Sequence, residues 1–228
     1  MTGTGPPTEP SPTEPESIEP GVTGFAAVVL AGGAARRMGG ADKPALPVGG
    51  RPMVDRVLAA VADADLRIVV GPDADLPTGV RTTREQPPGG GPVAAVAAGL
   101  ALLADAAPPG TSDTGTVALL AADLPLLTSD AVRQLRTALS RAAGADGVVF
   151  VDGTGRAQFL CGVWRVAPLR AALGRVAAAH DGVLTGTSMR ALIVEMTVTE
   201  LAWRGAGPPP WFDCDTEDDV RRAEEWIG

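Results

Sequence analysis

The chain has 228 residues, 45% of them hydrophobic, and a formal net charge of −8. Length and composition fit one globular domain with a single core. The acidic balance excludes a broad polyanion-binding surface, so no nucleic acid partner is expected and any phosphate site must be local. The chain has one histidine, no tyrosine and two cysteines. Ser-His-Asp and Cys-His catalysis are therefore excluded unless His180 is the catalytic histidine, and a zinc site of usual ligand spacing is excluded as well.

The N-terminal residues differ from the rest of the chain. Residues 1–22 repeat Pro, Thr, Glu and Ser and contain too little apolar surface to offset their ordering entropy. A disordered Pro/Thr/Glu-rich tail is predicted there, followed by one domain over residues 23–228. No Lys or Arg precedes Arg36, and no apolar run approaches the about 20 residues of a membrane-spanning helix. A cytoplasmic protein without membrane contact is expected, with both cysteines buried in a reducing compartment.

From Phe25 onward, short apolar runs alternate with Ala- and Leu-rich stretches of helical spacing. The predicted strands are 25–30, 66–70, 117–122, 147–151, 158–164 and 193–201, and the predicted helices are 52–64, 93–105, 129–143, 167–179, 186–192 and 216–227. A short extended segment is expected at 211–214. The alternation predicts an α/β fold, a Rossmann-like three-layer α/β/α sandwich with a mostly parallel sheet.

The first predicted strand runs directly into a glycine-rich loop. Leu30 is followed by Ala31-Gly32-Gly33 and then by Arg36-Arg37-Met38-Gly39-Gly40. Small residues let successive backbone amides approach an anion, and ligands of open α/β sheets gather beyond the carboxyl ends of the strands. No P-loop pattern occurs, and the one dinucleotide-type match, Gly89 to Ala94, follows no convincing strand. A phosphate cradle is predicted, with a flexible turn as the alternative.

Charged residues beside this loop favour the phosphate cradle. Lys43 is the only lysine among the 19 Lys and Arg residues of the chain. A compact ammonium can contact phosphate oxygens where a broad guanidinium does not fit. Of the two arginines in the loop, Arg37 lies closer to the Met38-Gly39 turn and is the candidate to contact the β- and γ-phosphates. Lys43 and Arg37 are therefore predicted catalytic residues.

A predicted central strand ends in an aspartate. Residues 117–122 are followed by Asp123, which stands at the ligand-binding end of a buried strand. Because Ser129 is available to cap the next helix, the role of metal ligand is favoured for Asp123 over that of a turn residue. Mg²⁺ takes one or two protein carboxylates, so Asp123 needs at most one companion. Asp213 and Asp215 share one face of an extended segment. Asp215 is the preferred second ligand, with helix N-cap as the alternative.

Together these motifs resemble the molybdenum cofactor guanylyltransferases (MobA-like NTP transferases) and their relatives, the molybdenum cofactor cytidylyltransferases. The resemblance covers nearly everything after the tail. The order and spacing of Leu30 to Gly33, Arg36 to Gly40 and Asp42-Lys43 look like the family signature. Gly90-Gly91-Pro92 resembles the second glycine loop, Asp123-Leu124-Pro125 the metal motif and Asp215-Thr216 the C-terminal motif.

The resemblance implies a fold of the nucleotide-diphospho-sugar transferase type and a role for each matched residue. Lys43 and Arg37 are implied to contact the phosphates and Asp123 to bind Mg²⁺. Glu85 looks like an acidic position that helps to hold guanine, where the family often has Asp, and Gly71 falls where guanylyltransferases often carry Asn. The implied nucleotide site comprises Leu30, Ala31, Gly32, Gly33, Lys43, Gly71, Glu85, Gly91, Pro92 and Asp123.

The implied reaction is transfer of GMP from GTP to molybdopterin, with Mg²⁺ as cofactor and pyrophosphate as leaving group. A phosphate nucleophile is already ionised and needs no general base, in agreement with a chain almost without histidine. The implied small-molecule partners are GTP or another NTP and a molybdopterin-type acceptor. Molybdenum cofactor enzymes are further expected partners, through transient contact. Gln158, Arg165 and Arg190 are candidates to face the acceptor, with Arg190 at its phosphate.

Three alternatives stay open. The first is cytidylyl transfer, or transfer to another small acceptor, on the same fold. The second is a dinucleotide-dependent oxidoreductase built on Gly89 to Ala94. The third is a catalytically silent nucleotide-binding regulator, which the departures at Gly71 and Glu85 permit.

Overall fold

The computed structural model describes Met1 and residues 24–32, 43–72, 75–106 and 115–228. Residues 2–22 of the predicted tail lie outside the described residues, and the division into a tail and one domain stays a prediction. The elements in chain order are β1 (Phe25–Leu30), the 3₁₀ helix η2 (Lys43–Ala45), β2 (Pro47–Val48), β3 (Arg51–Pro52), α1 (Met53–Ala60), β4 (Leu66–Val70), β5 (Val80–Thr83), α2 (Pro92–Ala106), β6 (Thr116–Ala121), α3 (Ser129–Arg141), β7 (Gly147–Val151), β8 (Ala157–Arg165), α4 (Val166–Ala179), α5 (Met189–Ile193), β9 (Val198–Ala202) and α6 (Glu217–Ile227).

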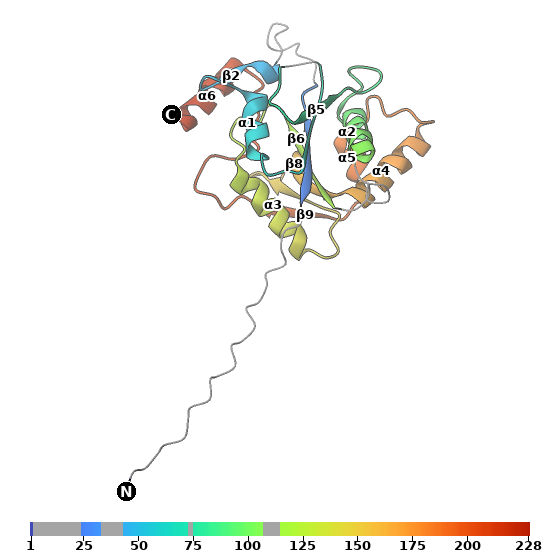
Figure 1. Cartoon of the computed structure of the whole chain (residues 1–228). Coiled ribbons are helices and arrows are strands. Elements are labelled where there is room, and N and C mark those ends of the chain that lie inside the picture. The colour runs from blue at the N-terminus through green and yellow to red at the C-terminus, as the bar shows by residue number, and fades with distance from the viewer. Residues whose placement is uncertain (2–23, 33–42, 73–74, 107–114) are drawn as a thin grey trace.

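Seven strands form one twisted sheet in the order β5-β4-β1-β6-β8-β7-β9. The pairs β4·β5, β1·β4, β1·β6 and β7·β9 are parallel, and β8 runs antiparallel to both of its neighbours. Six of these strands therefore point the same way, and β1 lies near the middle of the sheet (Figure 1). The predicted three-layer fold with a mostly parallel sheet is confirmed.

Helices cover both faces of the sheet. One core cluster lies under α1 and α3 and includes Val29, Leu120 and Val163, while a second lies under α2, α4 and α5 and includes Val28, Leu119 and Trp164. The two helix groups stand on opposite sides of the sheet in Figure 1. Neighbouring residues of one strand enter different clusters because side chains alternate between the faces. The central strands are therefore apolar on both faces, which explains their continuous hydrophobic runs.

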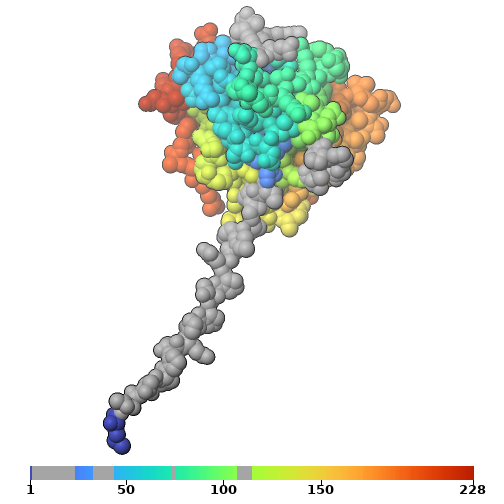
Figure 2. All heavy atoms as spheres, in the orientation of Figure 1, coloured from blue at the N-terminus to red at the C-terminus, as the bar shows by residue number. Residues whose placement is uncertain are grey.

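A third, smaller cluster joins the C-terminal helix to the β2–β3 hairpin. Val48, Met53, Cys214 and Ala223 are buried together there. The backbone N–H of Gly49 donates to a carboxylate oxygen of Glu224 over 3.0 Å. Figure 2 shows the C-terminal residues (red) against the light-blue segment that contains β2 and β3. This contact holds the end of the chain against the hairpin that follows η2.

Most predicted elements are confirmed, with shifted ends. The predicted helix over 52–64 ends at Ala60, and the strand expected from 193 begins at Val198. No strand forms at 211–214. Strand β5 was not predicted because Val80–Thr83 is a short edge strand with only one apolar residue, so it shows no buried periodicity. None of the helices in the described ranges is long and apolar enough to cross a membrane.

The reactivity of Cys161 on β8 can be used to test the burial of the core. Its side chain is buried, and desolvation raises the pKa of the thiol from 9.0 to about 12. Iodoacetamide is expected to leave Cys161 unmodified in the folded protein at pH 8 and to alkylate it in denaturant, as peptide mass spectrometry would report. Because the unfolded thiol ionises first, the free energy of unfolding should decrease as pH rises from 9 to 12. Rapid alkylation of the folded protein would contradict this burial.

Candidate active site

The carboxyl ends of the parallel strands meet at one edge of the sheet, and β8 begins at that edge. At its centre, the N–H of Ala31 donates to the carbonyl of Val70 over 2.8 Å, and the N–H of Ala122 donates to the carbonyl of Leu30 over 3.0 Å. Leu30 is buried and Gly32 is exposed. The chain thus leaves the sheet between β4 and β6, where open α/β sheets bind their ligands.

Three predicted phosphate-binding residues follow this exit. Gly33 and Arg37 lie outside the described residues. Lys43 opens the 3₁₀ helix η2 that leads into the β2–β3 hairpin. The predicted contacts of these residues with phosphate stay predictions.

Gly71 serves close packing beside this exit. The residue follows β4, and its N–H donates to the carbonyl of Thr83 over 3.0 Å. A Cβ on Gly71 would lie 3.0 Å from the Cβ of Ala31 and 3.1 Å from its carbonyl carbon. These contacts are tighter than normal van der Waals packing, so a side chain here would displace the start of the glycine loop. The glycine is therefore explained by the position of Ala31.

Glu85 occupies a buried position between two glycine segments. Only 5% of the residue is exposed. One carboxylate oxygen accepts the N–H of Gly89 over 2.8 Å, and the same oxygen lies 3.7 Å from where a Cβ of Gly32 would stand. The other oxygen, Oε2, is buried and has no hydrogen-bond partner within the described ranges. A buried acceptor is costly unless a donor reaches it, so Oε2 can receive a donor from a bound ligand.

The second glycine loop leads from Glu85 into helix α2. Gly89 and Gly91 have φ values of 78° and 91°, in the left-handed region that favours glycine. The carbonyl of Gly90 accepts the N–H of Gly186 over 2.8 Å, which ties this loop to the segment before α5. Pro92 is the first helical residue, where a missing N–H costs nothing. The N-terminal amides of α2 thus lie at the ligand-binding edge and favour an anionic group.

Asp123 and the C-terminal aspartates are brought together by a backbone contact. Asp123 is half-buried just beyond β6, and its carbonyl accepts the N–H of Cys214 over 3.2 Å. Cys214 is buried, and the flanking Asp213 and Asp215 are exposed and half-buried respectively. Two carboxylate-bearing segments that are far apart in sequence therefore meet at the edge of the sheet.

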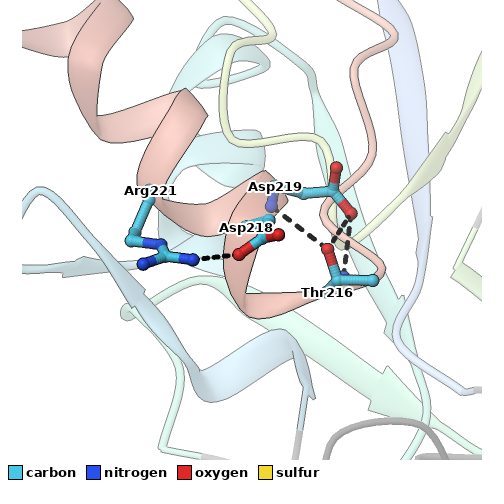
Figure 3. Close-up of polar contacts among 4 residues, drawn as sticks. All are labelled: Thr216, Asp218, Asp219 and Arg221. Carbon is cyan, nitrogen blue, oxygen red and sulfur yellow. Dashed lines mark hydrogen bonds and ion pairs between the residues drawn. The ribbon is translucent and has the colours of Figure 1, made fainter.

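The structure also decides how helix α6 begins. Thr216 is the N-cap: its side chain accepts the N–H of Asp219 over 3.2 Å, and the carboxylate of Asp219 accepts the N–H of Thr216 over 2.9 Å (Figure 3). This reciprocal pair is a capping box. The alternative of Asp215 as N-cap is therefore wrong, and its own N–H donates to Asp219 over 3.1 Å. Helix α3 likewise takes Thr128, and not Ser129, as its cap.

The donor chemistry of this edge fits Mg²⁺. No group of three or more His, Cys, Asp or Glu side chains is gathered as a metal site in the part of the chain that the structure describes. Mg²⁺ commonly uses one or two carboxylates and completes its octahedron with phosphate and water oxygens. Asp123 and one of the aspartates beside Cys214 match that donor set. Which of the two aspartates would serve stays a prediction.

The three acceptor candidates lie at different places. Gln158 is near the start of β8, whose register with β6 sets Cys161 opposite Leu120, so Gln158 lies at the ligand-binding edge. Arg190 is exposed in the first turn of α5. Arg165 is at the opposite end of β8, where its guanidinium donates to the carbonyls of Ala145 and Leu139 over 2.9 and 3.1 Å. Arg165 therefore stabilises the end of α3, and its candidacy for the acceptor is wrong.

One residue of this edge was not singled out from the sequence. Asp152 follows β7 and accepts hydrogen bonds from Thr154, Arg156 and Gln158. The Asp-Gly pair after an apolar run is a recognisable hairpin signal. That signal indicates a turn and gives no sign of a contact with Gln158.

Comparisons with known proteins agree with this fold. Residues 27–193 match the family described as the MobA-like NTP transferase domain. A molybdenum cofactor guanylyltransferase of Bradyrhizobium sp. (strain ORS 278) is 31% identical over 207 residues, covering 89% of this chain and 92% of that protein. A second one, from Rhodobacter capsulatus, is 29% identical and covers 88% of this chain and 95% of that protein.

Solved structures share the architecture. Molybdopterin-guanine dinucleotide biosynthesis protein A from Archaeoglobus fulgidus superposes with a TM-score of 0.63 at 18% identity, covering 88% of this chain and 97% of that one. The 2-C-methyl-D-erythritol 4-phosphate cytidylyltransferase from Thermus thermophilus has a TM-score of 0.61 at 21% identity, with coverages of 89% and 98%. At these identities the likeness shows the fold alone. The family match, the relatives and the arrangement of the sheet edge lead to one conclusion: the chain belongs to the MobA-like NTP transferase family and is a nucleotidyltransferase.

Proposed function

We propose that this nucleotidyltransferase transfers GMP from GTP to molybdopterin and releases pyrophosphate. The observation that carries the choice of base is the buried carboxylate of Glu85, with one oxygen held by Gly89 and the other without a protein donor among the described residues. Guanine presents two adjacent N–H donors, at N1 and the 2-amino group, to a carboxylate. Cytosine and adenine each present a single amino group next to a ring acceptor. A carboxylate therefore favours guanine.

The proposed reaction follows from the residues at the sheet edge. An ionised phosphate oxygen of the acceptor attacks the α-phosphorus of GTP, the new P–O bond forms, and the bond from the α-phosphorus to the bridging oxygen breaks to release pyrophosphate. Mg²⁺, when bound, neutralises charge on the phosphate oxygens. Asp123 with Asp215 would hold the ion, while Lys43 and Arg37 would contact the phosphates and stabilise developing charge.

The order of the strands supports a place for the acceptor. Glu85 follows β5, on one side of β1, while Asp123 follows β6 on the other side, and β8 with Gln158 comes next. A nucleotide with its base at Glu85 and its phosphates near Asp123 would occupy the edge from β5 to β6. The acceptor would then lie beyond Asp123, beside Gln158.

Further parts of the proposal concern the surroundings of the enzyme. GTP is a cytoplasmic metabolite, so we propose a cytoplasmic location. Transient contact with enzymes that use the molybdenum cofactor would pass the product on. Arg190 remains the proposed contact for the acceptor phosphate, because its exposed side chain is available to an anion.

A pyrophosphate-release assay with ATP, CTP, GTP and UTP, each with molybdopterin-type cofactor and Mg²⁺, tests the function. GTP alone is expected to support rapid release. A preference for CTP would replace the proposed guanylyl transfer by cytidylyl transfer. Binding of GTP without release would favour a silent nucleotide-binding protein, and binding of a nicotinamide dinucleotide with no response to GTP would favour an oxidoreductase.

Replacement of Glu85 by glutamine tests the base contact. The amide nitrogen would face the guanine N–H donors, so kcat/KM for GTP should fall about 10- to 100-fold, the range expected for losing a charge-assisted hydrogen bond. ITP lacks the 2-amino group, and the preference of the wild type for GTP over ITP should largely disappear in the variant. The exposed Glu200 on β9 gives a matched control, Glu200→Gln. An unchanged GTP/ITP ratio in Glu85→Gln would show that Glu85 does not contact the base.

A further inference from the structure

The β7–β8 hairpin lies at the ligand-binding edge of the sheet. Strand β7 ends at Val151 and β8 begins at Ala157. Because β7 runs parallel to β6 through their shared neighbour β8, residues 152–156 stand at the same edge as Asp123. The hairpin is thus in a position to contact a molecule bound at the carboxyl ends of the strands.

Asp152 organises this hairpin with one of its two carboxylate oxygens. Oδ1 accepts the N–H of Thr154 over 2.8 Å, the hydroxyl of Thr154 over 2.7 Å and the N–H of Arg156 over 3.0 Å. The hydroxyl of Thr154, followed by the backbone donors, lowers the pKa of the Asp152 carboxyl. The side chain is therefore an anion at neutral pH, with Oδ1 committed to the turn.

The second oxygen of Asp152 orients the amide of Gln158. Oδ2 accepts from Nε2 of Gln158 over 3.2 Å, and the same Nε2 donates to the carbonyl of Arg156 over 3.2 Å. A carboxylate and a carbonyl can only accept, so the amide nitrogen must face them. The amide oxygen, Oε1, is consequently turned away from these two partners. It accepts no hydrogen bond from the residues in the described ranges.

The register of β8 with β6 gives the level of Gln158 along the sheet. The last paired residues are Leu120 and Cys161, so Gln158 lies three residues before this pair, at the end of the sheet where Asp123 follows β6. Strand β8 also shifts its register against β7 at this end, so the start of β8 departs from regular pairing. Gln158 is half-buried there. Gln158 therefore lies at the same edge of the sheet as Asp123, on the side of β6 opposite to Glu85.

We propose that Asp152 is a positioning residue of the acceptor subsite: it holds Gln158 with the amide oxygen presented to the acceptor, so the subsite selects a phosphate-bearing acceptor that also offers an N–H donor. This inference rests on the proposed function, because it assigns a feature of the acceptor that receives the nucleotidyl group. The ring N–H and amino groups of an aminopyrimidinone, such as a pterin contains, are donors of this kind. An acceptor of similar size that presents only carbonyl or ether oxygens would meet a repulsive contact.

The test uses the full chain and measures KM for the acceptor separately from KM for GTP. Asp152→Asn keeps Oδ1 for the turn and sets an amide nitrogen against Nε2 of Gln158, so only the Arg156 carbonyl still holds Nε2 and the Gln158 amide is no longer fixed with its oxygen toward the acceptor. We expect KM for molybdopterin to rise about 10-fold, as for the loss of one hydrogen bond that leaves a polar partner unpaired. KM for GTP and the melting temperature should remain within about twofold and about 2 °C of the wild type, changes too small to signal a lost interaction.

Two further variants separate positioning from turn stability. Thr154→Val removes a bond to Oδ1 but leaves Oδ2 and Gln158 in place, so it should lower the melting temperature slightly and leave KM for the acceptor unchanged. In the double variant Asp152→Asn, Gln158→Glu, the new carboxylate accepts from the amide introduced at position 152 and again presents an oxygen. Its KM for the acceptor should return toward the wild-type value, while Gln158→Glu alone, with two facing carboxylates, should not.

The outcomes distinguish this inference from the function on which it rests. Wild-type protein that releases no pyrophosphate with GTP and molybdopterin overturns both. If the wild-type protein turns over GTP and molybdopterin but KM for the acceptor is unchanged in Asp152→Asn, the positioning role alone is overturned. An equal rise in KM for the acceptor in Thr154→Val would assign the effect to the stability of the hairpin and would also overturn the positioning role. The same holds if KM for the acceptor in the double variant is as high as in the worse of the two single variants.

Discussion

Asp123→Asn is expected to reduce kcat for nucleotidyl transfer by about 1,000-fold, since this factor corresponds to about 4 kcal/mol of lost charge stabilisation. Asp123 lies just beyond β6, and its backbone carbonyl contacts the segment that carries Asp213 and Asp215. An amide of nearly the same shape preserves packing but supplies a neutral ligand, which binds Mg²⁺ much more weakly than a carboxylate. The measurement is pyrophosphate release over a titration of Mg²⁺.

The expected pattern is a weaker response to Mg²⁺, with GTP turnover partly recovered at high metal concentration. Asp181→Asn is the matched control, because Asp181 is exposed in the loop after α4 and has a φ of 51°, which Asn tolerates. Asp213→Asn and Asp215→Asn, titrated in the same way, identify the second ligand by the larger shift in Mg²⁺ dependence. Wild-type turnover in Asp123→Asn would exclude the proposed metal site.

Lys43→Ala is expected to lower kcat/KM by about 100- to 1,000-fold, the range for removing one preorganised charge-stabilising donor. Lys43 is the only lysine of the chain and follows the glycine loop that leaves the centre of the sheet. The loss should appear in kcat as well as in KM for GTP, because charge develops on the phosphates during transfer. Thermal melts of the variant should match the wild type, since the residue opens only a short 3₁₀ helix.

The single lysine also permits a chemical test without mutation. An amine-reactive acylating reagent can modify only Lys43 and the N-terminal amine. Acylation of Lys43 should inactivate the enzyme, and GTP with Mg²⁺ should protect Lys43 while leaving the N-terminus reactive, as mass spectrometry of peptides would show. Lys43→Arg keeps the charge on a broader group and should recover only part of the activity. An acylated protein with full activity would remove Lys43 from the phosphate site.

Much of the fold follows from local sequence signals. Strands β1, β4 and β7 coincide with their predicted ranges because each is a mainly apolar run that is largely buried in a parallel sheet. Strand β5 and the hairpin β2–β3 escaped prediction because they are short and mostly exposed, so neither shows a hydrophobic period. The N-caps of α3 and α6 differ by one residue from the expected positions, since adjacent side chains can satisfy the same terminal N–H groups, and α1 ends at Ala60, before its predicted end.

The candidate site likewise has one part that local sequence signals predicted and one part that they did not. The glycine loop, Lys43 and the strand-end Asp123 are local patterns with a chemical meaning: they predicted a phosphate site with a metal, and the family resemblance implied nucleotidyl transfer. Arg165 could not be assigned from sequence, because its actual role depends on carbonyls at and beyond the end of α3, some 20 to 26 positions away in the chain. Asp152 escaped notice for a similar reason: its contact with Gln158 requires the closed hairpin.

The sequence by itself determined the family and the order of most strands and helices, and it predicted the chemistry of the first glycine loop, because each depends on residues that are neighbours along the chain. Only the tertiary structure decided that Glu85 is buried between two glycine loops, that Gly71 makes room for Ala31, and that Cys214 joins the C-terminal aspartates to Asp123. Most of these contacts join segments that are distant in the chain. Their existence depends on sheet order and register, which the packing of two hydrophobic faces fixes for the whole domain at once.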